Sequence, residues 1–212
     1  MANVSGNTYG LTILSPIIED NSRIDICHSM ELRWYLSQLP RDRRSPFARI
    51  SSTWLARLVV MDDVIFVGLP ACEEHLKSRY LVFETNFEGD LDTYLRRLAT
   101  ETSEFVNAVW SHCVGFPGTA NVDGFIAYMK KCQIETTFFF ADVNNRTVDS
   151  TLKALHTQAS LAKFMETHQG MPAAELQQAF GRFLEELKTA PPLPHGGDDA
   201  SRDIPQERRP NG

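Results

Sequence analysis

The 212-residue chain lacks a basic excess, long apolar runs and paired cysteines, and each absence excludes a class of protein. Its 21 Lys and Arg against 27 Asp and Glu give a formal charge of −6. This argues against nucleic-acid binding, because phosphate neutralisation needs a basic surface. No apolar stretch approaches the ~20 residues of a membrane span. The first ten residues lack a basic region followed by an apolar one, which predicts a cytoplasmic protein.

Cysteine is scarce, and its spacing is not that of a disulfide framework. The four cysteines form no CxxC pair and are widely spaced: Cys27, Cys72, Cys113 and Cys132. Without a secretory signal they are expected to be reduced thiols. Hydrophobic residues make up 42% and aromatic residues 10% of the chain, which is too much for a wholly disordered protein. Composition therefore predicts a folded chain and does not identify its function.

The first half of the chain alternates between β-rich and helical segments. Three segments are predicted strands: residues 9–15, residues 53–61, which contain no turn residue, and residues 79–86. Asn21 and Ser22 are candidate caps for a helix whose apolar residues recur at helical spacing as far as Pro40.

The middle of the chain predicts more helix and a last strand. Asp90 can cap a helix whose apolar residues follow the i, i+3, i+4, i+7 pattern, and further helical turns cover residues 105–110 and 125–132. TTFFFA at 136–141 is the fourth predicted strand. The resulting order, βαββαβ, predicts an α+β protein with a ferredoxin-like antiparallel sheet.

The sheet is expected to be apolar on both faces. Leu58–Met61 and Phe138–Phe140 are consecutive apolar residues, whereas a strand with one wet face should alternate. Another subunit, the C-terminal segment or a ligand must then cover the second face. We expect a homodimer that buries more than ~1,000 Å².

The C-terminal segment predicts two further helices. Thr147 can cap the first, which ends near Gly170, and Pro172 suits the first turn of the second. Residues 1–190 are therefore predicted to form a single domain with a C-terminal helical extension. Residues 191–212 are rich in proline, glycine and charge and are predicted to be a disordered tail.

Four segments together resemble one known family: SPFARI at Ser45–Ile50, STWLARLVVMDD at Ser52–Asp63, RYLVFETNFEGDLDTYL at Arg79–Leu95 and VWSHCVGFPG at Val109–Gly118. They are similar to a group of poorly characterised bacterial proteins with a ferredoxin-like, dimeric α+β-barrel core. Members tend to have a Thr-His-Phe-Ala-Arg-Trp strand, a Ser-Asn-Phe-Asp-Gly turn and a Trp-x-x-x-x-Gly-[Phe/Tyr]-Pro segment. The resemblance covers roughly residues 9–142.

This chain departs from the family pattern in its second strand. Trp54 stands where the group has histidine, and Leu58 where it has a second aromatic residue, whereas Arg57 is retained. Some relatives occur beside haem proteins of peroxide metabolism, and the wider superfamily includes haem enzymes such as the dye-decolourising peroxidases. The resemblance implies haem as a candidate cofactor and oxidoreductase-like chemistry as a candidate activity. If that histidine is catalytic in the family, this chain either lacks the activity or uses another residue for it.

His112 and Arg57 are the candidate catalytic residues. His112 lies at the end of a helix before the GFPG turn and can project into a cavity, with a structural, hydrogen-bonded histidine as the alternative. Arg57 is a lone guanidinium in an apolar strand and must find an anion or a solvent channel, because unpaired burial is costly. The candidate anions are a substrate carboxylate, a haem propionate or an internal acid: Asp62, Asp63 or Glu84.

The candidate substrate-binding residues are expected to line a space between the sheet and its helices. They are Arg79 as a polar contact and four apolar walls: Trp54, Phe83, Phe138 and Phe140. If haem binds, its axial ligand is His112, His156 or His168. Cys72 and His75 have the spacing of a metal-binding pair, but no companion pair exists, so no metal site is predicted.

These residues support three hypotheses for function. The first is a small-molecule enzyme or binder with an apolar pocket for a hydrophobic molecule, of which haem-dependent peroxide chemistry is one form. The second is a cofactor-independent enzyme of the dimeric α+β-barrel type. The third is a non-catalytic dimeric interaction module whose apolar sheet face is the interface.

Overall fold

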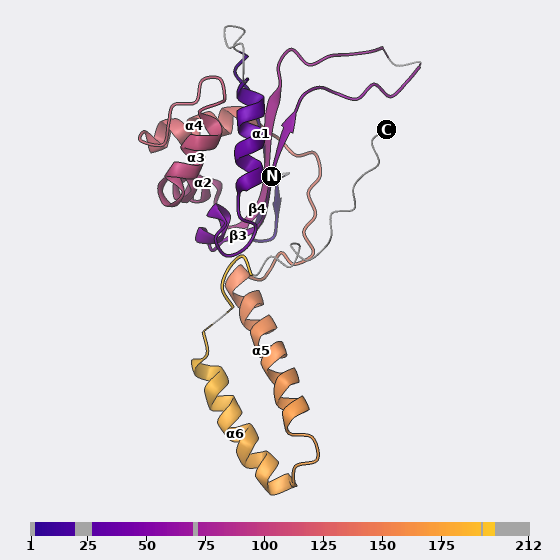
Figure 1. Cartoon of the computed structure of the whole chain (residues 1–212), viewed down its shortest axis with the longest axis vertical. Helices are drawn as coiled ribbons and strands as arrows, with labels where there is room; N and C mark the ends of the chain where they lie inside the picture. The colour runs from indigo at the N-terminus through magenta and orange to yellow at the C-terminus, as the bar shows by residue number, and fades with distance from the viewer. Residues whose placement is uncertain (1–2, 20–26, 70–71, 192, 198–212) are drawn as a thin grey trace.

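A computed structural model describes residues 3–19, 27–69, 72–191 and 193–197, and it is drawn in Figure 1. The described chain is an α+β protein with one antiparallel sheet and six α-helices. The strands are β1 (Val4–Ser5), β2 (Thr8–Pro16), β3 (Thr53–Met61), β4 (Tyr80–Glu88) and β5 (Gln133–Ile134). The helices are α1 (His28–Gln38), α2 (Leu91–Glu101), α3 (Ser103–Trp110), α4 (Val122–Cys132), α5 (Val148–Thr167) and α6 (Ala173–Thr189).

The three long strands form the centre of the sheet. β4 lies between β2 and β3 and pairs antiparallel with both along nearly its whole length, with a bulge in β3 between Thr53 and Leu55. β1 and β5 both pair with the other edge of β2, so the sheet runs from β1 and β5 through β2 and β4 to β3. The strands predicted at 9–15, 53–61 and 79–86 are confirmed to within two residues.

The strand predicted at 136–141 is wrong. The strand after α4 is the two-residue β5, and the chain then leaves the sheet edge. The edge of β2 beyond β5 is already occupied by β1 and by Asn3, whose carbonyl accepts a hydrogen bond from Gly10 N–H at 2.8 Å. The backbone of residues 136–141 therefore has no free strand edge there to pair with. Phe139 instead lies against Gly10, where an added Cβ would come within 2.8 Å of the ring.

One face of the sheet is covered by α1, α2, α3 and α4, as Figure 1 shows. Alternate residues of β4 point into this layer, and Phe83 and Phe87 are fully buried there. The ring of Phe83 lies edge-to-face with that of Trp110, with ring centroids 5.4 Å apart. The ring of Phe87 stacks on that of Tyr94, with centroids 3.8 Å apart. The β4 side chains Phe83 and Phe87 therefore form part of the core between the sheet and the helices.

The turn from β4 into α2 follows the sequence prediction. Gly89 has a φ of 98°, a left-handed conformation that glycine adopts without strain. Asp90 then caps the helix, because its carboxylate accepts a hydrogen bond from Thr93 N–H at 2.8 Å. The apolar positions of α2, Tyr94, Leu95 and Leu98, are buried against the sheet layer, as their spacing indicates.

The second face of the sheet is mixed rather than apolar. The consecutive apolar residues of β3 divide between the two faces, so that Val60 is buried while Val59 is 44% exposed. Arg57 and Glu84 lie opposite one another on the exposed face and form an ion pair. The sequence expectation of two apolar faces is therefore only partly met.

The described parts of the connection between β3 and β4, residues 62–69 and 72–79, project away from the sheet (Figure 1) and are called the β3–β4 arm. Its apolar residues Ile65, Val67 and Leu69 are 84–92% exposed. Asp63 organises the base of the arm: its carboxylate accepts hydrogen bonds from Val64 N–H and Leu76 N–H, each at 2.8 Å. These bonds and the neighbouring His75 hold the pKa of Asp63 at about 2.

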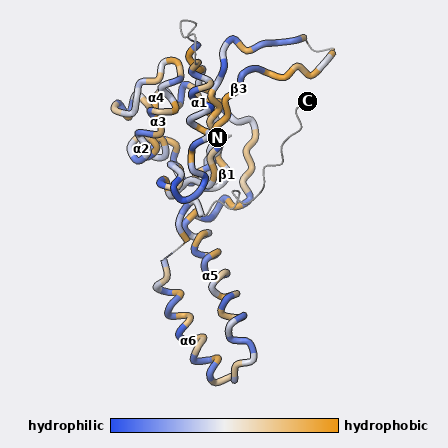
Figure 2. The backbone as a smooth tube through the Cα atoms, viewed as in Figure 1, coloured by the Kyte–Doolittle hydropathy of each residue, from blue (hydrophilic) through white to orange (hydrophobic). Residues whose placement is uncertain are grey.

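α5 and α6 form an antiparallel C-terminal hairpin that extends away from the sheet, and Figure 2 shows hydrophobic residues along both helices. Thr147 caps α5 through a capping box with Ser150, as predicted. The two helices meet where Phe164 stacks on Phe183 with ring centroids 4.8 Å apart. No helix within the described residues is long and apolar enough to cross a membrane.

Two predictions fall largely outside the described residues. The candidate caps Asn21 and Ser22 belong to residues 20–26, and α1 begins at His28 with Cys27 as its N-cap. Most of the predicted disordered tail is likewise not described. Within its described part, the Gly197 carbonyl accepts a hydrogen bond from Arg43 N–H at 3.0 Å.

Candidate metal centre

The first turn of α1 places two potential metal ligands on one face. His28 and Glu31 are three residues apart, and side chains at this spacing lie on the same side of a helix. Glu31 is also favoured in the first turn because the helix dipole is positive there. The sequence therefore presents an imidazole and a carboxylate together at the start of this helix.

His112 reaches the same place from the turn that follows α3. The backbone of His112 and of Val114 is bonded to the end of β2 and the residues that follow it. Ile18 N–H donates to the His112 carbonyl at 2.9 Å, and Val114 N–H donates to the Pro16 carbonyl at 2.8 Å. Cys113, the next residue, is buried, and burial raises the pKa of its thiol to about 12. The sheet thus fixes the position from which the His112 side chain projects.

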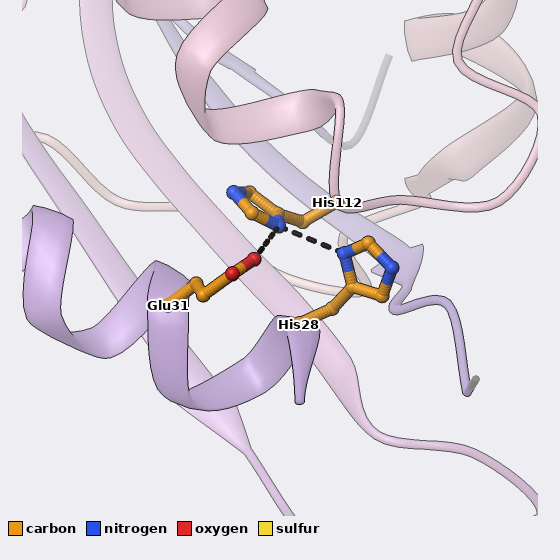
Figure 3. Close-up of side chains that lie close together, drawn as sticks. All are labelled: His28, Glu31 and His112. Carbon is orange, nitrogen blue, oxygen red and sulfur yellow. Dashed lines mark hydrogen bonds and ion pairs between the residues drawn. The ribbon is translucent and has the colours of Figure 1, made fainter. Parts of the chain in front are cut away.

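The three side chains converge, as Figure 3 shows. Nδ1 of His28 lies 3.0 Å from Nδ1 of His112, and Oε2 of Glu31 lies 3.6 Å from the same nitrogen. Potential ligand atoms of all three residues lie within 4.8 Å of one another. The His112 side chain is 17% exposed and that of Glu31 is 35% exposed. The cluster therefore lies at the edge of the core with one side open to solvent.

These separations fit ligands of a common metal ion. Ligand atoms bound tetrahedrally at 2.0–2.1 Å lie ~3.3 Å apart, and the observed 3.0 and 3.6 Å bracket that value. The hydrogen bond between the two imidazoles requires one ring nitrogen to act as acceptor, so at least one lone pair points into the cluster. The geometry is therefore that of a site in which a cation can replace a shared proton.

The donor set is also one that metal enzymes use. Two histidines and one carboxylate are the protein ligands of His₂Glu catalytic zinc sites and of the facial triad of non-haem iron(II) enzymes. Three protein ligands leave at least one coordination position for water or substrate. The arrangement of His28, Glu31 and His112 can therefore bind a metal and present it to a small molecule.

A thiol lies at the N-cap of α1, one residue before His28. The hydroxyl of Ser29 lies 3.1 Å from the Cys27 sulfur. The pKa of the Cys27 thiol is lowered, first by this hydrogen bond, then by the Met30 backbone and by the positive charge of Arg79. Arg79 itself pairs with Asp62, with its Nε 3.3 Å from a carboxylate oxygen. The predicted substrate-binding residue Arg79 is therefore paired with an internal acid.

The structure brings His112 into this cluster and places Arg57 elsewhere. Arg57 lies on the exposed face of the sheet, where its Nε donates to Glu84 at 2.8 Å. An internal acid was one of the partners expected for Arg57, and Glu84 is that acid. Trp54 lies at the bulge of β3 and lines an open groove between β3 and α5.

The other predicted site residues do not gather into one pocket. Phe83 belongs to the core between the sheet and the helices, whereas Phe138 and Phe140 are 81% and 69% exposed. His168, a candidate haem ligand, stacks on Phe164 at 4.1 Å and lies with His156 on the hairpin helix α5. The predicted residues are thus spread over the core, both faces of the sheet and the hairpin.

Sequence reasoning missed His28 and Glu31. Their signal is the His-x-x-Glu spacing in the first turn of a helix, which is weak because many helices carry such pairs on a solvated face. The third ligand, His112, lies 84 residues after His28. Backbone bonds between the end of β2 and the turn after α3, together with the packing of α1 on α3 and β3, bring the three together, and this tertiary arrangement is not visible in the sequence.

A scan against protein-family models found no matching family, and searches of curated proteins and of solved structures found no match to this chain.

Proposed function

We propose that the chain binds a divalent transition metal through His28, Glu31 and His112 and acts as a metal-dependent small-molecule enzyme. The observation that carries this proposal is the convergence of two imidazoles and one carboxylate from two separate elements. Helix α1 supplies two of the ligands, and a turn anchored to the sheet supplies the third. A site held by two fixed elements keeps its ligands in place without the metal, as a functional site requires.

The donor set favours zinc(II) or iron(II). Imidazole suits zinc, copper, iron and nickel, and the added carboxylate resembles the His₂Glu and facial-triad sites. When bound, such an ion supplies Lewis acidity towards water or a substrate oxygen. The chain's own contribution is to orient the three ligands toward one another.

We also propose that the sheet has the ferredoxin-like βαββαβ arrangement. Two observations support this: β5, β2, β4 and β3 lie in this order across the sheet, and α1 follows β2 while α2, α3 and α4 separate β4 from β5. On this view β1 is an added strand on the edge shared with β5. The relation to dimeric α+β-barrel proteins that the sequence resemblance implies rests on the same arrangement.

Metal binding is tested with the purified chain and three variants. The metal content of the protein as isolated is measured by mass spectrometry, and zinc(II) or cobalt(II) is titrated into the metal-free protein by calorimetry. We expect one metal per chain, and cobalt(II) should give the visible absorption of a low-coordinate nitrogen and oxygen site. His112→Ala and Glu31→Gln should each weaken binding by more than ~10-fold, because each removes one of three ligands.

His156→Ala is the matched control, since it removes an imidazole from the same chain without touching the cluster. Its affinity should equal that of the wild type. Absence of stoichiometric binding in the wild type, or equal loss in the control and in His112→Ala, would contradict the proposed metal centre. An absorbance scan of the same preparations also tests haem, because a Soret band would favour the haem-dependent hypothesis over this one.

A further inference from the structure

One face of the C-terminal hairpin carries large apolar side chains that are open to solvent. Met165 on α5 and Phe180 on α6 line a shallow hollow around Phe164. Leu161 lies four residues before Met165, and Leu184 four residues after Phe180, so both belong to the same side of the hairpin. We call Leu161, Met165, Phe180 and Leu184 the hairpin face. Their exposed fractions are 38–63%.

The rest of the described chain does not cover this face. The hairpin extends away from the sheet and from the four helices packed on it (Figure 1). Amphipathic helices take most of their stability from packing their apolar side against a second layer. Two helices alone supply one layer, so the hairpin face needs a second one from outside the chain's own sheet domain.

Gly181 is a second observation that points to a close neighbour. It lies inside α6, where glycine weakens a helix. A Cβ added to Gly181 would meet no heavy atom within 4 Å, so packing among the described residues does not require a glycine there. It directly follows Phe180 and lies four residues after Gln177, which lines the hollow. A glycine at this flank lets another helix approach closely.

The flanks of the hairpin face carry a single charge, on Lys188 of α6. By helical spacing the other flanking residues are Gln158 and Ala162 on α5 and Gln177 and Gly181 on α6, and Lys188 is paired with Glu185 at 2.6 Å. The chain has a net charge of −6, so two copies repel one another over most surfaces. A face flanked mainly by uncharged residues is where an identical chain can approach with little like-charge repulsion.

The area of the face matches what a dimer needs. α5 and α6 have 20 and 17 residues and are therefore ~30 and ~25 Å long. Two packed helices are about 20 Å wide, which gives a face of roughly 500 Å². Two such faces in contact remove roughly 1,000 Å² from solvent, the area of a small specific interface.

We infer that a second copy of this chain packs its hairpin face against this one, so that two hairpins form a four-helix bundle with two-fold symmetry. The same patch then serves both partners, and each helix pair supplies the layer that the other lacks. This interface is separate from the proposed metal centre and does not depend on it.

Sedimentation equilibrium of the full chain between ~1 and ~100 μM tests the inference. The wild type should have twice the 23.9 kDa mass of one chain. Phe180→Glu and Met165→Glu place a charge in the interface and should weaken the dimer by at least ~10-fold. Gln178→Glu is the matched control, because it adds the same charge to the opposite side of α6, and it should leave the dimer unchanged.

Gly181→Leu gives a variant that cannot be dismissed as unfolded, since leucine is a better helix former than glycine. Its circular dichroism should show wild-type helix content, while its added side chain blocks the partner helix and weakens the dimer. A wild type that stays monomeric at ~100 μM overturns the inference. A dimer that survives Phe180→Glu and Gly181→Leu overturns it as well, because the interface then lies on another surface, such as the exposed face of the sheet.

Discussion

Replacing Phe83 by alanine distinguishes a packed core from a ligand pocket between the sheet and the helices. The Phe83 ring is fully buried, lies edge-to-face with Trp110 at 5.4 Å and stacks with Phe47 at 5.8 Å. Truncation of such a ring lowers the free energy of unfolding by ~3–5 kcal/mol, since it removes apolar burial and leaves a cavity. For a chain of this length we expect a melting temperature about 6–20 °C lower.

The assay is urea unfolding followed by circular dichroism. Phe83→Ala should lower the midpoint concentration and leave the m-value unchanged, because the variant unfolds the same surface. Phe83→Leu preserves most of the volume and should lose less than ~1.5 kcal/mol. Phe138→Ala removes the same side chain from an 81% exposed position and should change stability by less than ~0.5 kcal/mol.

A small decrease in the free energy of unfolding of Phe83→Ala would refute this reasoning. If Phe83→Ala loses less than ~1.5 kcal/mol, the ring already borders open space, and the pocket expected from the sequence lies between the sheet and the helices after all. If Phe138→Ala lowers the free energy of unfolding as much as Phe83→Ala does, Phe138 is buried rather than exposed.

Three further predictions follow from single contacts. Arg57→Ala should lower the free energy of unfolding by only ~0.2–1 kcal/mol in urea, because the Arg57 side chain is 67% exposed; a loss of ~3–5 kcal/mol would mean a buried pair. The pKa of Asp90 is lowered by hydrogen bonds from Thr93. The ionised carboxylate therefore stabilises the folded protein above pH 3.8, and this contribution is lost as the pH falls through the lowered pKa. Asp90→Asn should keep the cap at pH 7 and lose less stability than the wild type between pH 7 and pH 3, and an equal loss in both proteins would contradict the cap. Cys113 should resist thiol reagents in the folded protein while exposed Cys72 reacts, as mass spectrometry of labelled peptides can check; equal labelling of the two would contradict the burial of Cys113.

The elements that sequence predicted well are those with local causes. The strand at 53–61 has no turn residue inside it, and the cap at Asp90 needs only its own helix. The strand at 136–141 failed because its partner edge is occupied by β1, a two-residue strand at the other end of the chain. Competition between distant segments for one edge has no local signature in the sequence.

The candidate site divides in the same way. His112 was singled out because it directly follows a helix, and the end of that helix has a local signal in the sequence. Its partners His28 and Glu31 were missed, because their meeting depends on how the end of β2 bonds to the turn after α3. The partner of Arg57 stayed open among three acids for a similar reason. Only the strand register, which places Arg57 opposite Glu84, selects one of them.

The β3–β4 arm is a position at which the chain can be cut into two fragments. It joins two neighbouring central strands through a segment whose residues Ile65, Val67 and Leu69 contribute almost nothing to the core. Exposed extended segments of this kind tolerate insertion and proteolytic cleavage. A cut there leaves one fragment with β2 and β3 and another that begins with β4, and both strand pairings of β4 run between the two fragments. The arm is accordingly the natural place to split the protein into complementing halves, or to insert a reporter domain without disturbing the sheet.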